Sequence, residues 1–87
     1  MQIEITFRHL DHTPALDEKI RDKSKKFGKW FSESGRINWT CWKEGAQFVS
    51  EVRIHDHKKD FVAKSTEDDL YKTFDQVVGK IKNQVNP

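Results

Sequence analysis

The spacing of apolar residues changes several times along this chain, and these changes constrain its fold more than any other feature. Residues 2–8, QIEITFR, alternate apolar and polar side chains, which is the period of a strand with one buried face. The spacing then lengthens to that of a helix over residues 14–31, and Thr13 and Pro14 suit its N-cap and first position. The apolar face of this predicted helix contains Leu16, Ile20, Phe27 and Phe31.

Three further strands and a second helix follow. Residues 36–43, 47–55 and 61–65 are rich in strand-forming residues and are joined by short polar turns. An apolar stripe with helical spacing then runs from Leu70 to Val85. We expect Thr66 to cap this helix, with Asp69 at the third helical position completing a capping box.

The predicted order of elements is therefore β-α-β-β-β-α, an α+β fold. We expect a two-layer sandwich in which a four-stranded sheet carries both helices on one face and leaves the other face open. Residues 1–87 are expected to form a single domain, because the chain is short and no linker or repeat interrupts it. The sheet face beneath the helices is expected to contain Ile3, Ile5, Trp39, Val52 and Ala63.

Composition narrows the class of protein further. The formal net charge is only +2, but residues 14–36 contain seven basic and four acidic side chains, so the positive charge is local. Cys41 is the only cysteine, which excludes an intrachain disulfide and fits a reducing compartment. No apolar run approaches the roughly 20 residues that span a bilayer, and no signal-peptide core is visible. These features predict a cytoplasmic protein with no membrane partner.

The residue patterns that usually carry catalysis are missing. The sequence has no nucleophile motif, no phosphate-binding glycine loop and no paired carboxylates in an apolar frame, so we expect neither an enzyme nor a cofactor or small-molecule substrate. His55 and His57 would share a face of an extended segment, but zinc sites usually need four ligands. Solvated histidines are therefore favoured over a metal site, and Cys41 is expected to be a small core residue.

The stretch KIRDKSKKFGKWF, residues 19–31, contains six basic residues and one acid. Several cations on a rigid helix can hold the phosphates of a nucleic acid, because releasing counterions supplies much of the binding free energy. Surface helices are commonly rich in lysine, however, so composition alone favours a solvated helix face. Trp30 is expected at the edge of the core, and Trp42 on the open face of the sheet, where stacking on a base is the less favoured alternative to covering a neighbouring strand.

Three blocks of the chain together resemble a known family. They are MQIEITFRHLDHTPAL, DKSKKFGKWF and AKSTEDDLYKTFDQVVGKIKNQV, and the most specific part is Asp69-Leu70-Tyr71, followed by Asp75 and Lys80. Along nearly the whole chain these blocks resemble the short hibernation-promoting factor and ribosome-associated inhibitor family, also described as ribosomal subunit interface or sigma modulation proteins.

The resemblance implies a function in ribosome hibernation. Family members bind the small ribosomal subunit in the channel for messenger and transfer RNA, so translation stops under stress or in stationary phase. The implied partner is the small subunit through its ribosomal RNA, and the free protein is expected to be monomeric. Ile20, Phe31 and Tyr71 match core positions of the family. The resemblance and the neighbouring basic positions suggest as rRNA-binding residues Arg8, Lys23, Lys26, Lys29, Lys80 and Lys82.

One segment departs from the family pattern. The usual Lys-Leu-Glu-Arg-Gln-Leu near the end reads Lys80-Ile-Lys-Asn-Gln-Val85 here, so Asn83 replaces an arginine and Lys82 appears one place earlier. The alternative function is another RNA-binding module with the layout of double-stranded-RNA domains, which also carry helices on one side of a sheet. A protein-interaction or metal-binding domain is a third alternative.

Overall fold

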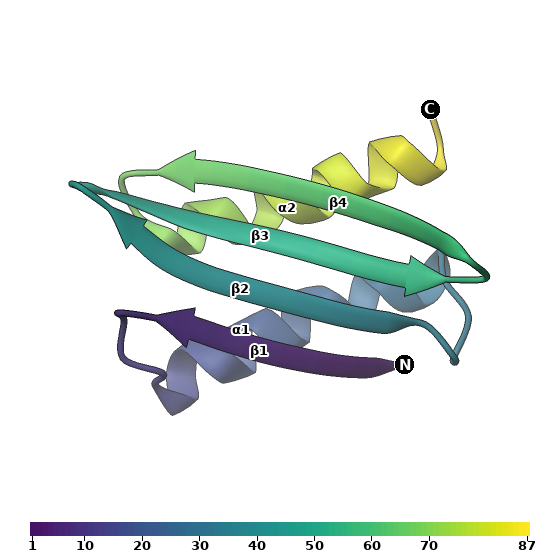
Figure 1. Ribbon diagram of the computed structural model, residues 1–87, viewed down its shortest axis with the longest axis horizontal. Helices are drawn as coiled ribbons and strands as arrows, with labels where there is room; N and C mark the ends of the chain where they lie inside the picture. The colour runs from purple at the N-terminus through teal and green to yellow at the C-terminus, as the bar shows by residue number, and fades with distance from the viewer.

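Four strands form one mixed sheet in a computed structural model that describes all 87 residues. In chain order they are β1 (Gln2–Arg8), β2 (Arg36–Glu44), β3 (Gln47–Asp56) and β4 (Lys59–Glu67), and they lie side by side in the same order (Figure 1). β1 and β2 are parallel because a helix connects them, whereas tight turns make the β2–β3 and β3–β4 pairs antiparallel. The predicted β-α-β-β-β-α order is confirmed.

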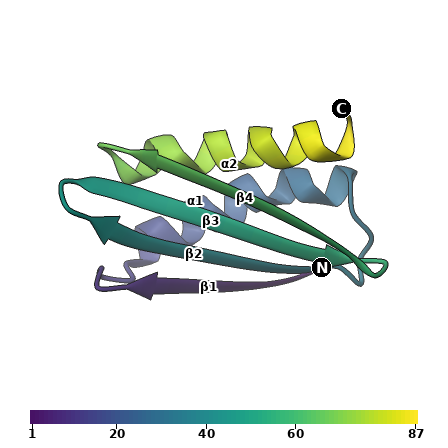
Figure 2. The same cartoon turned by 45° about the horizontal axis from the view of Figure 1, so that its top comes forward.

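Both helical segments cover the same face of this sheet, as predicted (Figure 2). The first consists of α1 (Pro14–Ser24), which continues as a 3₁₀ helix, η1 (Lys25–Lys29), and the second is α2 (Leu70–Val85). The two run in the same direction, so their first turns lie at one end of the sheet and their last turns at the other (Figure 1).

The core lies between the sheet and the helices. The alternating side chains of each strand point into it in rows, and one row consists of Ile5, Trp39, Val52 and Ala63 on neighbouring strands. The Trp39 ring packs edge-on against Phe74 of α2, with ring centres 5.6 Å apart. The expected inner face of the sheet is therefore confirmed, and Cys41 is buried in the same core, where burial raises the pKa of its thiol.

Two polar contacts hold the layers together. The Thr73 hydroxyl of α2 is buried 2.6 Å from the Ser50 hydroxyl of β3, and it also donates to the carbonyl oxygen of Leu70. At the other end of the sheet, the Asp56 carboxylate accepts hydrogen bonds from the backbone N–H and the hydroxyl of Ser32, which fixes the loop after η1. None of the helices has both the length and the apolar character needed to cross a membrane.

Three local predictions were wrong. The first helix was expected to run as one piece over residues 14–31, but its α-helical part ends at Ser24, whose hydroxyl bonds back to the Ile20 carbonyl, and a 3₁₀ segment follows. The cap of the second helix is Asp69, whose carboxylate accepts from the Tyr71 N–H, because Thr66 still belongs to β4. Tyr71 is not a core residue: 47% of it remains exposed.

Candidate nucleic-acid interface

A groove of 480 Å³ separates the later turns of the first helical segment from the middle of α2. Four of its eight lining residues are lysines, three from the first segment and one from α2. We call this surface the lysine groove. It is lined by Lys23, Lys26, Lys29, Lys82, Trp30, Asp75, Val78 and Gly79.

Local helical geometry explains why these lysines face the same way. Lys26 and Lys29 lie three residues apart in η1, and a 3₁₀ helix has three residues per turn, so their side chains leave from the same side. Lys82 lies four residues after Val78, one turn further along α2. All three lie near the C-terminal ends of their helices, where the helix dipole favours positive charge.

One ion pair spans the lysine groove. The Lys23 ammonium lies 2.8 Å from the Asp75 carboxylate and so joins the two helical segments. The hydrogen bond from Lys23 holds the pKa of Asp75 below its usual range, and the charges of Lys23, Lys26 and Lys19 act in the same direction. Asp75 is the only acid that lines the groove, so it balances one of the four lysines and leaves three in excess.

The chemistry that this arrangement can perform is anion binding. Lysine ammonium groups are mobile point charges that contact phosphates without reading a base sequence. The half-buried Trp30 and the small Gly79 make part of the surface uncharged. The structure contains no cluster of three or more His, Cys, Asp or Glu side chains that could hold a metal ion.

The other two predicted RNA-binding residues lie outside the lysine groove. Lys80 projects toward β4, where its ammonium donates to the Lys64 carbonyl oxygen over 2.6 Å. Arg8 ends β1 and alternates with the inward-facing residues of that strand, so it belongs to the open face of the sheet. The structure thus brings together four of the six residues, namely Lys23, Lys26, Lys29 and Lys82.

Trp42 lies on the open face of the sheet, as expected. Its ring is half-buried and its indole N–H donates to Glu44, while the Lys64 ammonium lies 5.4 Å from the ring centre. Its neighbours across the strands are Arg8 and Val49, and Val49 has no exposed surface although it lies outside the main core. These contacts favour the interpretation that Trp42 covers a neighbouring strand.

The two histidines weighed as metal ligands each have a carboxylate nearby. His55 lies at the end of β3, with its Nδ1 atom 2.8 Å from Asp60, and His57 lies in the following turn, 3.8 Å from Asp56. The side chains of both are more than half exposed. They are therefore solvated residues beside acids.

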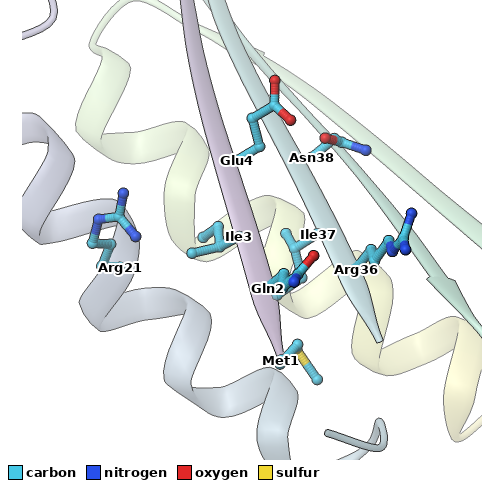
Figure 3. Close-up of a pocket in the computed structure, with 8 residues that line it drawn as sticks. All are labelled: Met1, Gln2, Ile3, Glu4, Arg21, Arg36, Ile37 and Asn38. Atoms are coloured by element: carbon cyan, nitrogen blue, oxygen red, sulfur yellow. The ribbon is translucent and has the colours of Figure 1, made fainter. Parts of the chain in front are cut away.

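A larger hollow, of 660 Å³, lies beside the first half of β1. Figure 3 shows Arg21 on α1 and Arg36 on β2 at its sides, with Glu4 and Asn38 along the strands. Its cations are few and Glu4 lies among them, so it offers less excess positive charge than the lysine groove.

Sequence reasoning missed four residues of the groove as site residues, namely Trp30, Asp75, Val78 and Gly79. Asp75 carried a usable signal, because it lies seven residues before Lys82 and two helical turns bring both to one side of α2. Gly79 also carried a usable signal, because a glycine inside a helix lowers the stability of that helix and suggests a packing or functional role.

Comparisons with known proteins agree with this architecture. The family model described as sigma 54 modulation protein / S30EA ribosomal protein matches residues 3–86. A ribosome-associated factor Y from Haemophilus influenzae is 30% identical over 86 residues, which cover 99% of this chain and 80% of that protein. A ribosome hibernation promoting factor from Acinetobacter guillouiae is 26% identical over 96 residues, covering 99% and 85%.

Solved structures show the same fold. A ribosomal subunit interface protein from Coxiella burnetii superposes with a TM-score of 0.88 at 22% identity, covering 99% of this chain and 94% of that one. The N-terminal domain of Protein Y from Thermus thermophilus superposes with a TM-score of 0.89 at 19% identity, covering 98% and 96%. Since the family model spans nearly the whole sequence, the chain belongs to the sigma 54 modulation protein / S30EA ribosomal protein family.

Proposed function

We propose that this protein is a ribosome hibernation factor that binds the small ribosomal subunit in its messenger and transfer RNA channel and blocks translation under stress or in stationary phase. The observation that carries the proposal is the lysine groove, a surface between two helices with three uncompensated positive charges. The relatives of this chain are named ribosome-associated and hibernation factors. Residues 1–87 would act as a single ribosome-binding domain in the cytoplasm, with no catalytic step and no cofactor.

In the proposed binding mode, an rRNA backbone lies along the lysine groove. Lys26, Lys29 and Lys82 would contact phosphates directly, and Lys23 would do so in competition with Asp75. Arg8 and Lys80 remain proposed contacts for other parts of the RNA. We expect Lys80 to contribute less than the groove lysines, because its ammonium must first leave the Lys64 carbonyl.

Co-sedimentation with purified small subunits tests this proposal. The wild-type protein should sediment with the subunit, and added salt should release it. The variant Lys26→Glu/Lys29→Glu/Lys82→Glu reverses the charge of the groove and should lose binding at least tenfold. It leaves Lys23 in place, so the ion pair between Lys23 and Asp75 that joins the two helical segments is kept, and circular dichroism checks that the variant is folded.

A matched control changes the same number of lysines elsewhere. Lys25→Glu/Lys58→Glu/Lys59→Glu alters the net charge equally but leaves the groove intact. Lys25 begins η1 and lies outside the groove lining, and the other two lie in the β3–β4 turn and at the start of β4. The control should bind much more tightly than the groove variant. Equal losses in the two variants would show that only overall charge matters and would refute the assignment of the groove.

A competition experiment distinguishes the proposed function from the alternative, a general double-stranded-RNA module. A hibernation factor should stay on small subunits when an excess of short RNA duplex is added, whereas a duplex-binding module should transfer to the duplex. Sucrose gradients of starved cells that contain the tagged protein then test the stress context. Absence from every ribosomal fraction would contradict the proposed function.

A further inference from the structure

A second groove lies at the opposite end of the helices from the lysine groove. It has a volume of 380 Å³ and is formed by the first turns of α1 and α2, the segment before α1 and the start of β3. We call it the apolar groove. Its walls are apolar side chains, namely Leu10, Leu16, Phe48, Leu70 and Tyr71.

The apolar walls are ordered, although they are partly exposed. Leu10, Leu16 and Phe48 pack against the core with one side and leave the other side to the groove. Tyr71 is 47% exposed, and its ring lies edge-on against Phe74, with ring centres 5.6 Å apart. A large exposed aromatic ring in a fixed position is a typical anchor for a partner, because little freedom is lost when it is covered.

The rim of the apolar groove is acidic. Asp11 and Asp69 line it, no basic residue does, and neither carboxylate forms an ion pair, although seven other acids in the protein do. Lys43 does not line the groove, but its ammonium lies 5.7 Å from the centre of the Phe48 ring.

From these observations we propose that the apolar groove binds an extended protein segment in which a large apolar side chain stands next to lysines or arginines. The apolar side chain fills the groove beside Tyr71, and the basic residues meet Asp11 and Asp69. An RNA strand is disfavoured here because the rim carboxylates repel phosphates. The protein would thus present its lysine groove to RNA and its apolar groove to a protein of the same assembly.

The proposal extends the ribosome-binding function, but its test uses the isolated protein. Amide chemical shifts of the ¹⁵N-labelled protein are followed during titration with the capped peptide KRFLKR. Two matched peptides are titrated in parallel: EEFLEE keeps the apolar pair, and KRSSKR keeps the basic residues. KRFLKR should shift the amides of Leu10, Leu16, Phe48 and Tyr71, and the two matched peptides should bind at least about tenfold more weakly.

Two groove variants and one control identify the site. Tyr71→Ala removes the exposed anchor and should weaken KRFLKR binding about tenfold, whereas Asp11→Asn should weaken it a few-fold, with a difference that disappears in high salt. Val62→Ala truncates another large side chain, 40% exposed on β4, and should leave binding unchanged. Circular dichroism confirms that each variant is folded.

Several results would overturn the proposal. The first two are an absence of amide shifts in the wild-type protein at millimolar KRFLKR, and binding of EEFLEE that is as tight as that of KRFLKR. The others are amide shifts confined to the lysine groove, and an RNA oligonucleotide that binds the apolar groove more tightly than the peptide does. Self-association that Tyr71→Ala abolishes would also overturn it, because the occupant would then be a second copy of this chain. Each of these results is independent of ribosome co-sedimentation, so failure here leaves the proposed function standing.

Discussion

Asp56 is a charged side chain that folding leaves only 7% exposed. The hydroxyl of Ser32 donates to one carboxylate oxygen over 2.6 Å and the Ser32 backbone N–H donates to the other over 3.0 Å. These hydrogen bonds, the hydroxyl first, hold the pKa of Asp56 below its usual value of 3.8. Because the residue ends β3 and Ser32 follows η1, this contact joins segments that are 24 positions apart.

The lowered pKa of Asp56 makes a prediction about pH. A group whose pKa is lower in the folded state stabilises the protein above its unfolded pKa, and that contribution is lost as the pH falls through the folded pKa. Replacing Asp56 with Asn should therefore lower the urea midpoint clearly at neutral pH and progressively less as the pH drops below about 4. Asp60→Asn, an exposed acid beside the same turn, controls for net charge. A loss of stability that is the same at every pH would contradict this account.

Single positions also decide which lysines form the site. Lys80 and Lys82 are two residues apart, which is about 200° around a helix, so they must leave α2 on nearly opposite sides. The sequence therefore contained enough information to separate them, although both were predicted to bind RNA. The partner of Lys80 was not predictable, because the Lys64 carbonyl that accepts from it belongs to β4 and its distance depends on how α2 packs.

At the scale of elements, hydrophobic spacing predicted every strand and helix, because burial of one face determines each of them. Boundaries were less predictable where two elements compete for the same residues. Residues 66 and 67 were expected to begin the second helix, but they pair with Val49 and Phe48 in the sheet, so the cap moves to Asp69. The 3₁₀ form of η1 was not predicted either, and this segment sets the direction of Lys26 and Lys29.

Helix α2 contains one residue that weakens it, Gly79, which lines the lysine groove. A β-carbon added at this position would meet no atom within 4 Å, so alanine fits without strain. Gly79→Ala should stabilise the protein by about 0.5–1 kcal/mol, because alanine loses less backbone entropy in a helix. Thermal unfolding should show a rise in Tm of several degrees, and Gly28→Ala in η1 is the matched comparison at another open site. A lower Tm for Gly79→Ala would show that the helix needs glycine there for packing.

The whole molecule is polarised along its helices. Lysines surround the later turns in the lysine groove, while acids and apolar side chains surround the first turns in the apolar groove. A net charge of only +2 hides this separation, since it averages over both ends. Composition therefore underestimates the affinity that one end can have for phosphate, and the arrangement appears only when the two helices are placed side by side on the sheet.

A substitution at Asp75 can test whether the excess positive charge of the lysine groove governs RNA binding. Asp75→Asn removes its only acid and releases the Lys23 ammonium, so the excess rises from three positive charges to four. Binding to the small subunit at low salt should strengthen about fivefold, the equivalent of about 1 kcal/mol for one nearby charge in water, and the gain should vanish at high salt. Folding stability should fall by no more than about 1 kcal/mol, because the carboxylate is 66% exposed and its ion pair is screened.

The control for this experiment is Asp22→Asn, which changes the net charge equally. Asp22 lies on the outer side of α1, beside Lys25 at 3.7 Å and outside the lysine groove, so its replacement should change affinity much less. If Asp75→Asn instead weakens binding while the protein stays folded, the carboxylate must position Lys23 for its phosphate. The groove would then depend on the placement of one lysine more than on its total charge. Equal gains in the two variants would show that the small subunit senses the charge of the whole protein and not of the groove.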